Sequence, residues 1–235
     1  MVLAGAGGAS QRLQEAAAAG CFGCLAGAPA YGTAANGARV AVLGDAATLA
    51  QEAYWAPPTF AWIEMLDSDA EELAAVARRA APWDFFCSFG VLASADLPLA
   101  GRIAGLVARR HPNVDHDALF DIELALHEAI SNALVHGNLG VGSMRELSMS
   151  ALDEYSRRME EGLSDPGLTR RRVEVAGRFD PEGFSVEVTD EGAGYDVGDV
   201  KLQGACGRGL ELIAAVAHNF TALDGGRRLN MRFQL

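Results

Sequence analysis

The chain has 235 residues, of which 50% are hydrophobic and 21% charged, so it can form a packed core in one large or two small domains, and global disorder is excluded. Its formal net charge of −12 argues against duplex DNA or an anionic membrane surface as a partner, although backbone N–H groups can bind a phosphate at any net charge. No uncharged stretch is long enough to span a bilayer and no signal peptide is visible, so we expect a cytoplasmic protein without nucleic-acid or membrane partners.

Residues 1–38 are rich in alanine and glycine, which predicts a flexible segment with one short helix, Gln11–Ala19. The segment contains a lone C-x-x-C, formed by Cys21 and Cys24. A structural zinc site needs a second ligand pair, and a redox motif needs a strand before it and a helix after it. Neither pattern is present, so we interpret both cysteines as reduced thiols of a cytoplasmic protein.

Residues 39–82 are expected to form a small α/β unit of unknown role. Buried strands are predicted at 39–43 and 60–66, and helices at 46–54 and from an N-cap in Asp67–Asp69 through Arg79. These elements are too few for a complete doubly wound domain. A degenerate receiver-like fold is the alternative, although no phosphoacceptor constellation is visible.

Residues 83–235 are predicted to form an α+β domain, with helices layered on one face of an antiparallel or mixed sheet. Apolar and polar residues alternate on both sides of the turn Asp180–Gly183, which predicts a hairpin. The same alternation predicts a final strand. The expected strands are 85–92, 172–179, 184–189 and 229–235, and the expected helices are 98–110, 117–136, 147–161 and 210–217.

The first segment with chemical potential is Glu123–Asn138, within the long predicted helix. Glu128 and Asn132 are one helical turn apart and lie together on the flank of its apolar stripe. A carboxylate beside a neutral amide oxygen suits a general base next to a ligand of a hard cation. An ordinary polar pair on a solvated helix face is the alternative for this segment taken alone.

The second segment, Val188–Asp196, places Asp190 at the end of a strand and two glycines, Gly192 and Gly194, directly after it. The glycines allow a sharp turn and the close approach of a flat ligand, and the carboxylate can accept a hydrogen bond from an exocyclic amine. A plain Asp/Gly turn is the alternative.

The third segment, Gly204–Ile213, is a glycine-rich loop that leads directly into a helix, an arrangement that directs free N–H groups at a phosphate. It is neither a Walker A loop, because no Lys-Ser/Thr follows, nor a convincing dinucleotide fingerprint, because no strand precedes it. Taken alone, the segment is a weak signal.

In this order and spacing, the three segments resemble the N, G1 and G2 boxes of the GHKL ATPase superfamily, which includes histidine kinases, gyrase and MutL. Within it the chain is most similar to the anti-sigma-factor serine/threonine kinases of bacterial partner-switching systems. The resemblance covers roughly residues 83–235 and implies a Bergerat fold, a two-layer α/β sandwich of the histidine-kinase-like ATPase type, here preceded by the small α/β unit.

The resemblance also implies roles for single residues. Glu128 matches the catalytic base, Asn132 the Mg²⁺ ligand and Asp190 the carboxylate that recognises the adenine amino group. The remaining matches are cofactor-binding positions, with glycines under adenine and ribose at Gly192 and Gly194, and the phosphate-binding stretch at Gly207, Arg208, Gly209 and Leu210. Residues 197–204 would form a short ATP lid.

The function implied is an ATP- and Mg²⁺-dependent kinase that phosphorylates a Ser or Thr of a small antagonist protein. Its implied partners are that antagonist or a sigma factor, and a homodimer is implied by the resemblance only. Two alternatives stay open: a nucleotide-gated module that sequesters a sigma factor or regulator without phosphotransfer, and a detached histidine-kinase catalytic domain. The chain shows no sign of the dimerisation hairpin that carries the phosphoacceptor of histidine kinases, which argues against the second alternative. His127 is a poor candidate for the phosphoacceptor, because it points away from Glu128 on the helix.

The chain departs from the superfamily pattern in two places. The hydroxyl residue that often supports adenine binding in the last part of the sheet is absent from Gly226–Leu229, which leaves two alternatives: a lower affinity for adenine, or support from Thr189 or Thr221. The insertion at 140–171 is longer than in compact anti-sigma kinases. Its charged helix either contacts a partner or packs on the surface of the domain, and we favour packing on the surface. His136 is expected either to shape the pocket or to be a structural residue.

Overall fold

The computed structural model describes residues 1–5, 10–25, 38–142, 148–194 and 208–235. The chain divides into two compact units, Met1–Phe89 and Gly90–Leu235. The first unit therefore begins inside the segment expected to be flexible and extends past residue 82, the boundary expected from the sequence.

The first unit is built on parallel strands in the order β2-β1-β3-β4-β5. This is the order of flavodoxin-like doubly wound domains, so the expectation of too few elements was wrong. The two strands that the sequence did not predict, β1 and β2, are short and lie in Ala/Gly-rich chain. The strands are β1 (Val2–Gly5), β2 (Gly23–Leu25), β3 (Val40–Gly44), β4 (Thr59–Glu64) and β5 (Phe85–Gly90).

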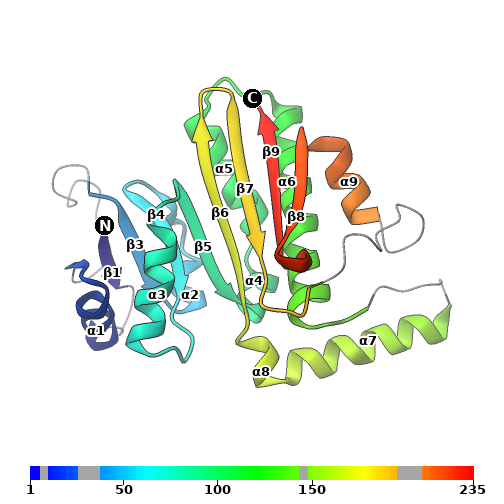
Figure 1. Cartoon of the computed structure of the whole chain (residues 1–235), viewed down its shortest axis with the longest axis horizontal. Helices are drawn as coiled ribbons and strands as arrows, with labels where there is room; N and C mark the ends of the chain where they lie inside the picture. The colour runs from blue at the N-terminus through cyan, green and yellow to red at the C-terminus, as the bar shows by residue number, and fades with distance from the viewer. Residues whose placement is uncertain (6–9, 26–37, 143–147, 195–207) are drawn as a thin grey trace. The chain divides into compact units, whose positions relative to one another are not determined.

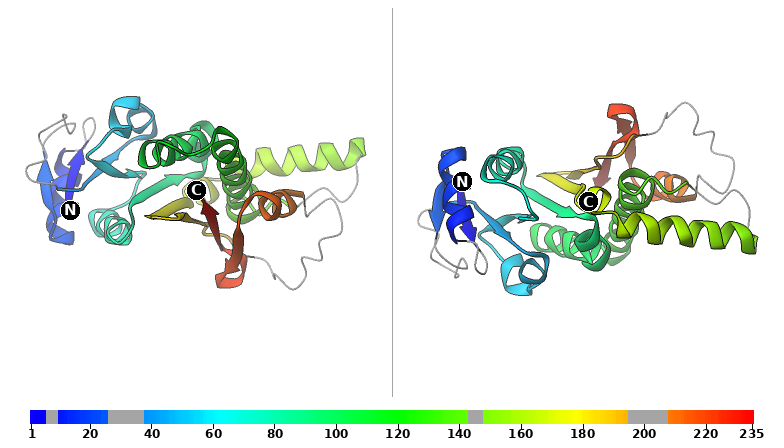
Figure 2. Two further views of the ribbon diagram at one scale, coloured as in Figure 1. Left: turned by 90° about the horizontal axis from the view of Figure 1, so that it is seen from above. Right: turned by 90° about the horizontal axis from the view of Figure 1, so that it is seen from below.

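The helices of the first unit are α1 (Ser10–Gly20), α2 (Ala46–Leu49) and α3 (Ala70–Ala80). A 3₁₀ turn at Glu52–Trp55 lies between α2 and β4. Helices α1 and α3 contact each other, and α2 contacts β3 and β4 from the other face (Figure 2). The predicted helix at 46–54 is interrupted because Gln51 is extended. Asp45, which follows β3, uses its carboxylate to cap α2 by accepting from the Thr48 N–H at 2.7 Å.

The end of α1 has the hydrogen bonds of a Schellman motif. The Phe22 N–H donates to the Ala17 carbonyl at 2.9 Å, and the Cys21 N–H donates to the Ala18 carbonyl at 3.3 Å. Cys21 occupies the position in this motif that favours glycine, with a φ of 54°.

We expect Cys21→Gly to stabilise the first unit by about 1 kcal/mol, because glycine adopts a left-handed conformation without the steric cost of a Cβ. All three tryptophans, Trp55, Trp62 and Trp83, lie in this unit, so urea unfolding followed by tryptophan fluorescence measures it directly. Cys21→Ala is the control, because alanine keeps the strain. Equal midpoints for the two variants would contradict the explanation.

The second unit contains an antiparallel sheet in the order β6-β7-β9-β8. The predicted hairpin and final strand are confirmed, whereas β8 was missed in the sequence. The strands are β6 (Arg172–Asp180), β7 (Gly183–Thr189), β8 (Asn219–Leu223) and β9 (Arg228–Gln234). Alternate residues of β7 and β9 are buried, which gives the sheet one apolar face.

Helices form a single layer on that apolar face (Figure 1). Helix α6 contacts α5 on one side and α9 on the other, so it occupies the centre of the layer. The helices of the layer are α5 (Leu99–Arg110), α6 (His116–Asn132) and α9 (Arg208–Val216). The short helix α4 (Val91–Asp96) precedes α5. The second unit is thus the expected α+β two-layer sandwich, but the predicted strand 85–92 ends at Gly90, the first residue of the second unit along the chain.

Two features follow α6 along the chain: a π-helix and an insertion with two helices. The predicted helix 117–136 changes at Asn132 into a π-helix over Ala133–Asn138. The insertion then carries α7 (Met149–Ser164) and α8 (Pro166–Thr169). Helix α7 buries only Gly162, which lies against Leu139, so it extends from the unit along most of its length instead of packing on the surface (Figure 1).

Candidate nucleotide site

Helix α6 positions the first predicted pair. Its buried stripe (Ile122, Ala125, Leu126, Ala129 and Ile130) faces the core. Glu128 and Asn132 lie beside that stripe and are half-buried. His127, by contrast, is exposed, so it is directed away from the pair as expected. The pair is therefore held at the margin of the core, where a ligand can reach both side chains.

The start of α9 lies directly against this pair. A Cβ added at Gly209 would be 2.8 Å from Glu128 Oε2 and 3.1 Å from Asn132 Nδ2. The first N–H groups of a helix have no partner within it, and α9 begins at Arg208, so these donors lie beside the carboxylate and the amide. The described part of the third segment, Arg208–Ile213, thus joins the first segment at Gly209. Gly207 and the expected lid at 197–204 lie outside the described residues.

Asp190 follows β7, at the end of the sheet. Its backbone N–H donates to the Arg227 carbonyl at 3.0 Å, and its Oδ1 accepts from the Gly192 N–H at 2.8 Å. A Cβ added at Gly194, which has a φ of 78°, would be 2.1 Å from the Gly225 carbonyl oxygen. Both glycines after Asp190 therefore lie in tight backbone contacts that a side chain would disrupt.

Burial raises the pKa of the Asp190 carboxyl above its ordinary value. The hydrogen bond from the Gly192 N–H and the charges of Arg227 and Arg171 oppose this effect, while the negative charge of Glu191 adds to it. A half-buried carboxylate that is short of solvent is well suited to accept a hydrogen bond from a ligand amine.

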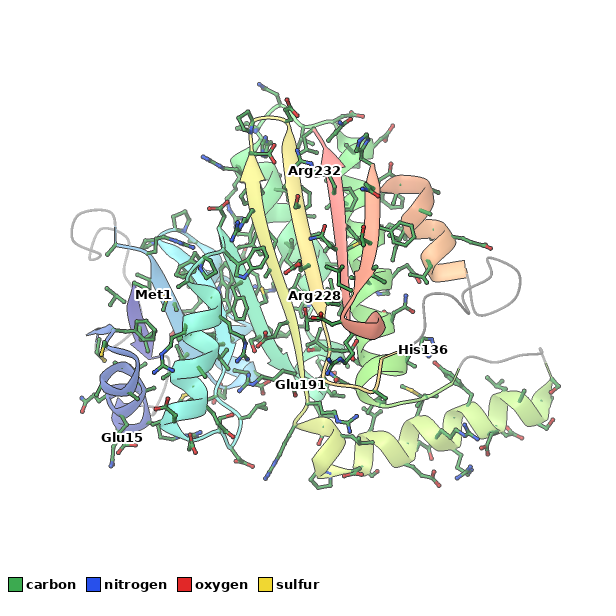
Figure 3. All side chains as sticks on the ribbon, viewed as in Figure 1. Met1, Glu15, His136, Glu191, Arg228 and Arg232 are labelled. Atoms are coloured by element: carbon green, nitrogen blue, oxygen red, sulfur yellow. The ribbon has the colours of Figure 1, made fainter. Side chains whose placement is uncertain are left out.

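The first and second segments also meet. A Cβ added at Gly137 would be 2.4 Å from Asp190 Cγ, and one added at Gly192 would be 2.1 Å from the Gly137 carbonyl oxygen. Asn138 Oδ1 accepts from the Glu191 N–H at 2.8 Å. Figure 3 shows Glu191 and His136 at the same end of the sheet. The helix predicted from the sequence ended at residue 136, and no role was predicted for Gly137 or Asn138.

Three further residues considered in the sequence, Thr189, Thr221 and His136, differ in their distance from the site and in their exposure. Thr189 is half-buried next to Asp190 and pairs with Arg228, whereas Thr221 is exposed on β8 and pairs with Asn230. Thr189 is thus the nearer of the two to Asp190 along the chain, but its side chain lies on the face of β7 opposite to the buried residues. The His136 Nδ1 lies 2.6 Å from the Val141 carbonyl oxygen, which links the π-helix to the chain after it.

The donor set fits Mg²⁺, which prefers oxygen ligands and combines one or two protein ligands with substrate phosphates and water. Asn132 would hold the ion, since its side chain lies beside both Glu128 and the start of α9. Among the described residues, no group of three or more His, Cys, Asp or Glu side chains is arranged to hold a metal.

The comparisons agree with this geometry. A family model described as a histidine kinase-like ATPase domain matches residues 92–233, which is more than half of the chain and nearly all of the second unit. No curated protein matches the chain. Among the helices of the described residues, none is both long and apolar enough to span a membrane. The chain therefore belongs to the histidine kinase-like ATPase family of the GHKL superfamily, whose fold is that of an ATP-binding domain.

Proposed function

We propose that the protein is an ATP- and Mg²⁺-dependent serine/threonine kinase of the anti-sigma-factor type. Its substrate would be a small antagonist protein of a bacterial partner switch, in the cytoplasm, with a sigma factor as a second partner and the kinase acting as a homodimer. The observation that carries the proposal is the contact between Gly209 and the Glu128–Asn132 pair. It places a candidate general base beside a helix start that can bind phosphate.

In the proposed reaction, the substrate hydroxyl oxygen bonds to the γ-phosphorus of ATP while the bond from that phosphorus to the β,γ-bridging oxygen breaks. ADP leaves, and the hydroxyl proton passes to the Glu128 carboxylate. The N–H groups at the start of α9 would bind the phosphates, and Asp190 would accept a hydrogen bond from the adenine amine. When bound, Mg²⁺ would neutralise charge on the phosphates.

Glu128→Gln tests the base. We expect phosphotransfer to fall about 10²-fold or more, because the amide cannot accept the proton, while ATP affinity stays close to that of the wild type. The measurement is transfer of labelled phosphate from ATP to purified small antagonist proteins of the same organism. Glu123→Gln is the matched control, since Glu123 is exposed on the same helix.

The chemical stability of the label separates the alternatives. A label on Ser or Thr survives acid, whereas phosphohistidine is hydrolysed. An acid-labile label would overturn the serine/threonine assignment in favour of a histidine-kinase catalytic domain. A wild type that binds ATP with Mg²⁺ and a partner but transfers no phosphate would overturn the kinase in favour of the nucleotide-gated binding module.

A further inference from the structure

We infer that Gly137 and Asn138 are positioning residues, which hold the Asp190 carboxylate in the orientation that recognises adenine. The inference rests on the proposed function, because it assumes that Asp190 binds the adenine amine. It adds two residues that neither touch the nucleotide in the proposal nor follow from the family match.

Gly137 bounds the space that the carboxylate occupies. A Cβ at this position would lie 2.4 Å from Asp190 Cγ and 2.6 Å from each carboxylate oxygen, well inside van der Waals contact. A second constraint comes from Gly192, whose N–H donates to Asp190 Oδ1 at 2.8 Å. The carboxylate thus lies against a bare Cα and accepts one backbone hydrogen bond, and both contacts restrict its direction.

Asn138 holds the backbone next to Asp190 through a hydrogen bond to Glu191. Its side chain is completely buried. The amide donates to the Arg172 carbonyl at 3.0 Å and accepts from the Glu191 N–H at 2.8 Å. The Glu191 carboxylate in turn accepts from the Arg172 N–H at 2.8 Å. One buried amide therefore joins the end of the π-helix, the start of β6 and the loop after β7.

The π-helix explains how the same segment reaches both Asn132 and Asp190. Its wider turn is seen in the bond from the Leu139 N–H to the Leu134 carbonyl, five residues earlier, at 3.0 Å. Residues after Asn132 are rotated relative to a continuous α-helix. Asn132, the last residue of α6, faces the start of α9, whereas Gly137 and Asn138 in the π-helix contact the residues that follow β7. Single π turns of this kind occur frequently at functional sites.

Gly137→Ala tests the inference, because the three atoms nearest to its Cβ all belong to the Asp190 carboxylate, a side chain that can move, so we expect the variant to fold. The probes are ATP and purine riboside triphosphate, which lacks the 6-amino group, titrated by calorimetry with Mg²⁺. We expect the wild type to prefer ATP about tenfold or more, as is typical of a hydrogen bond to a charged group. Gly137→Ala should lose this preference and bind the analogue as the wild type does.

A merely structural role would weaken both nucleotides equally and leave the preference intact, and that result would overturn the inference. Gly105→Ala is the matched control, since its Cβ would have only the Arg109 guanidinium near it, at 3.8 Å, and it should behave as the wild type.

A double-variant cycle gives a second measurement. If Gly137 acts through Asp190, Gly137→Ala should change ATP affinity less than twofold in an Asp190→Ala background, which has neither the adenine acceptor nor the side chain that the added Cβ displaces. Asn138→Ala should also lower the preference for ATP, because it releases the Glu191 N–H, and an unchanged ratio would count against Asn138. A wild type that binds ATP without preferring it over the analogue would overturn the adenine role of Asp190 itself, and the inference with it.

Discussion

Replacing Gly209 by alanine is expected to lower phosphotransfer about a hundredfold while the second unit stays folded. The added Cβ would lie 2.8 Å from Glu128 Oε2, so the carboxylate must move. That oxygen is at the end of a flexible side chain, and alanine is a better helix former than glycine, so the cost in stability is small. A misplacement of about 1 Å at a reacting group is enough to cost 10²-fold in rate.

The measurement is the rate of phosphotransfer together with the ATP affinity and a thermal unfolding curve for the same variant. Gly105→Ala, in the neighbouring helix α5, is the control, because nothing obstructs its Cβ. A Gly209→Ala protein that transfers phosphate at the wild-type rate would show that α9 and Glu128 do not share a reaction centre.

The second large effect is expected for Asp190→Asn, which should bind ATP about 10- to 100-fold more weakly. The amide oxygen can still accept from the Gly192 N–H, so the local turn is preserved. The charge that strengthens the hydrogen bond to the adenine amine is lost, however. Calorimetric titration measures the change.

The same substitution should stabilise the ligand-free protein. Because burial raises the pKa of Asp190, the folded state binds its proton more tightly than the unfolded state does, so ionisation costs stability. This cost is complete above the folded-state pKa and disappears below the ordinary pKa of the carboxyl. The stability advantage of Asp190→Asn should therefore be largest at neutral pH and vanish in acid. An advantage that grows as the pH falls would contradict the assigned direction.

Segments with strong local patterns were predictable from the sequence. The alternation on both sides of Asp180–Gly183 located the hairpin, and the capping sequence at Asp69 located α3, whose capping box with Glu72 is present. Strands β1 and β2 were missed because they are only four and three residues long and contain a single β-branched residue, Val2. Their strand state depends on pairing with chain that is distant in sequence.

In the candidate site, too, residues with a local sequence pattern could be predicted, whereas those that depend on long-range contacts could not. Glu128 and Asn132 could be paired from helical spacing alone, and the glycines after Asp190 from their clustering. The contacts of Asn138 could not be predicted, because they join residues 34 and 53 positions away. A buried amide of this kind gives no local signal, since only the fold determines which N–H and carbonyl it meets.

The central claim is that the three sequence segments surround one purine nucleotide, and calorimetric titration of the full chain with ATP tests it most directly. The account predicts one ATP site per chain whose affinity increases with Mg²⁺ in the wild type. In Asn132→Ala, the effect of Mg²⁺ should disappear while binding without Mg²⁺ remains. Absence of ATP binding by the wild type, or an undiminished effect of Mg²⁺ in Asn132→Ala, would contradict it.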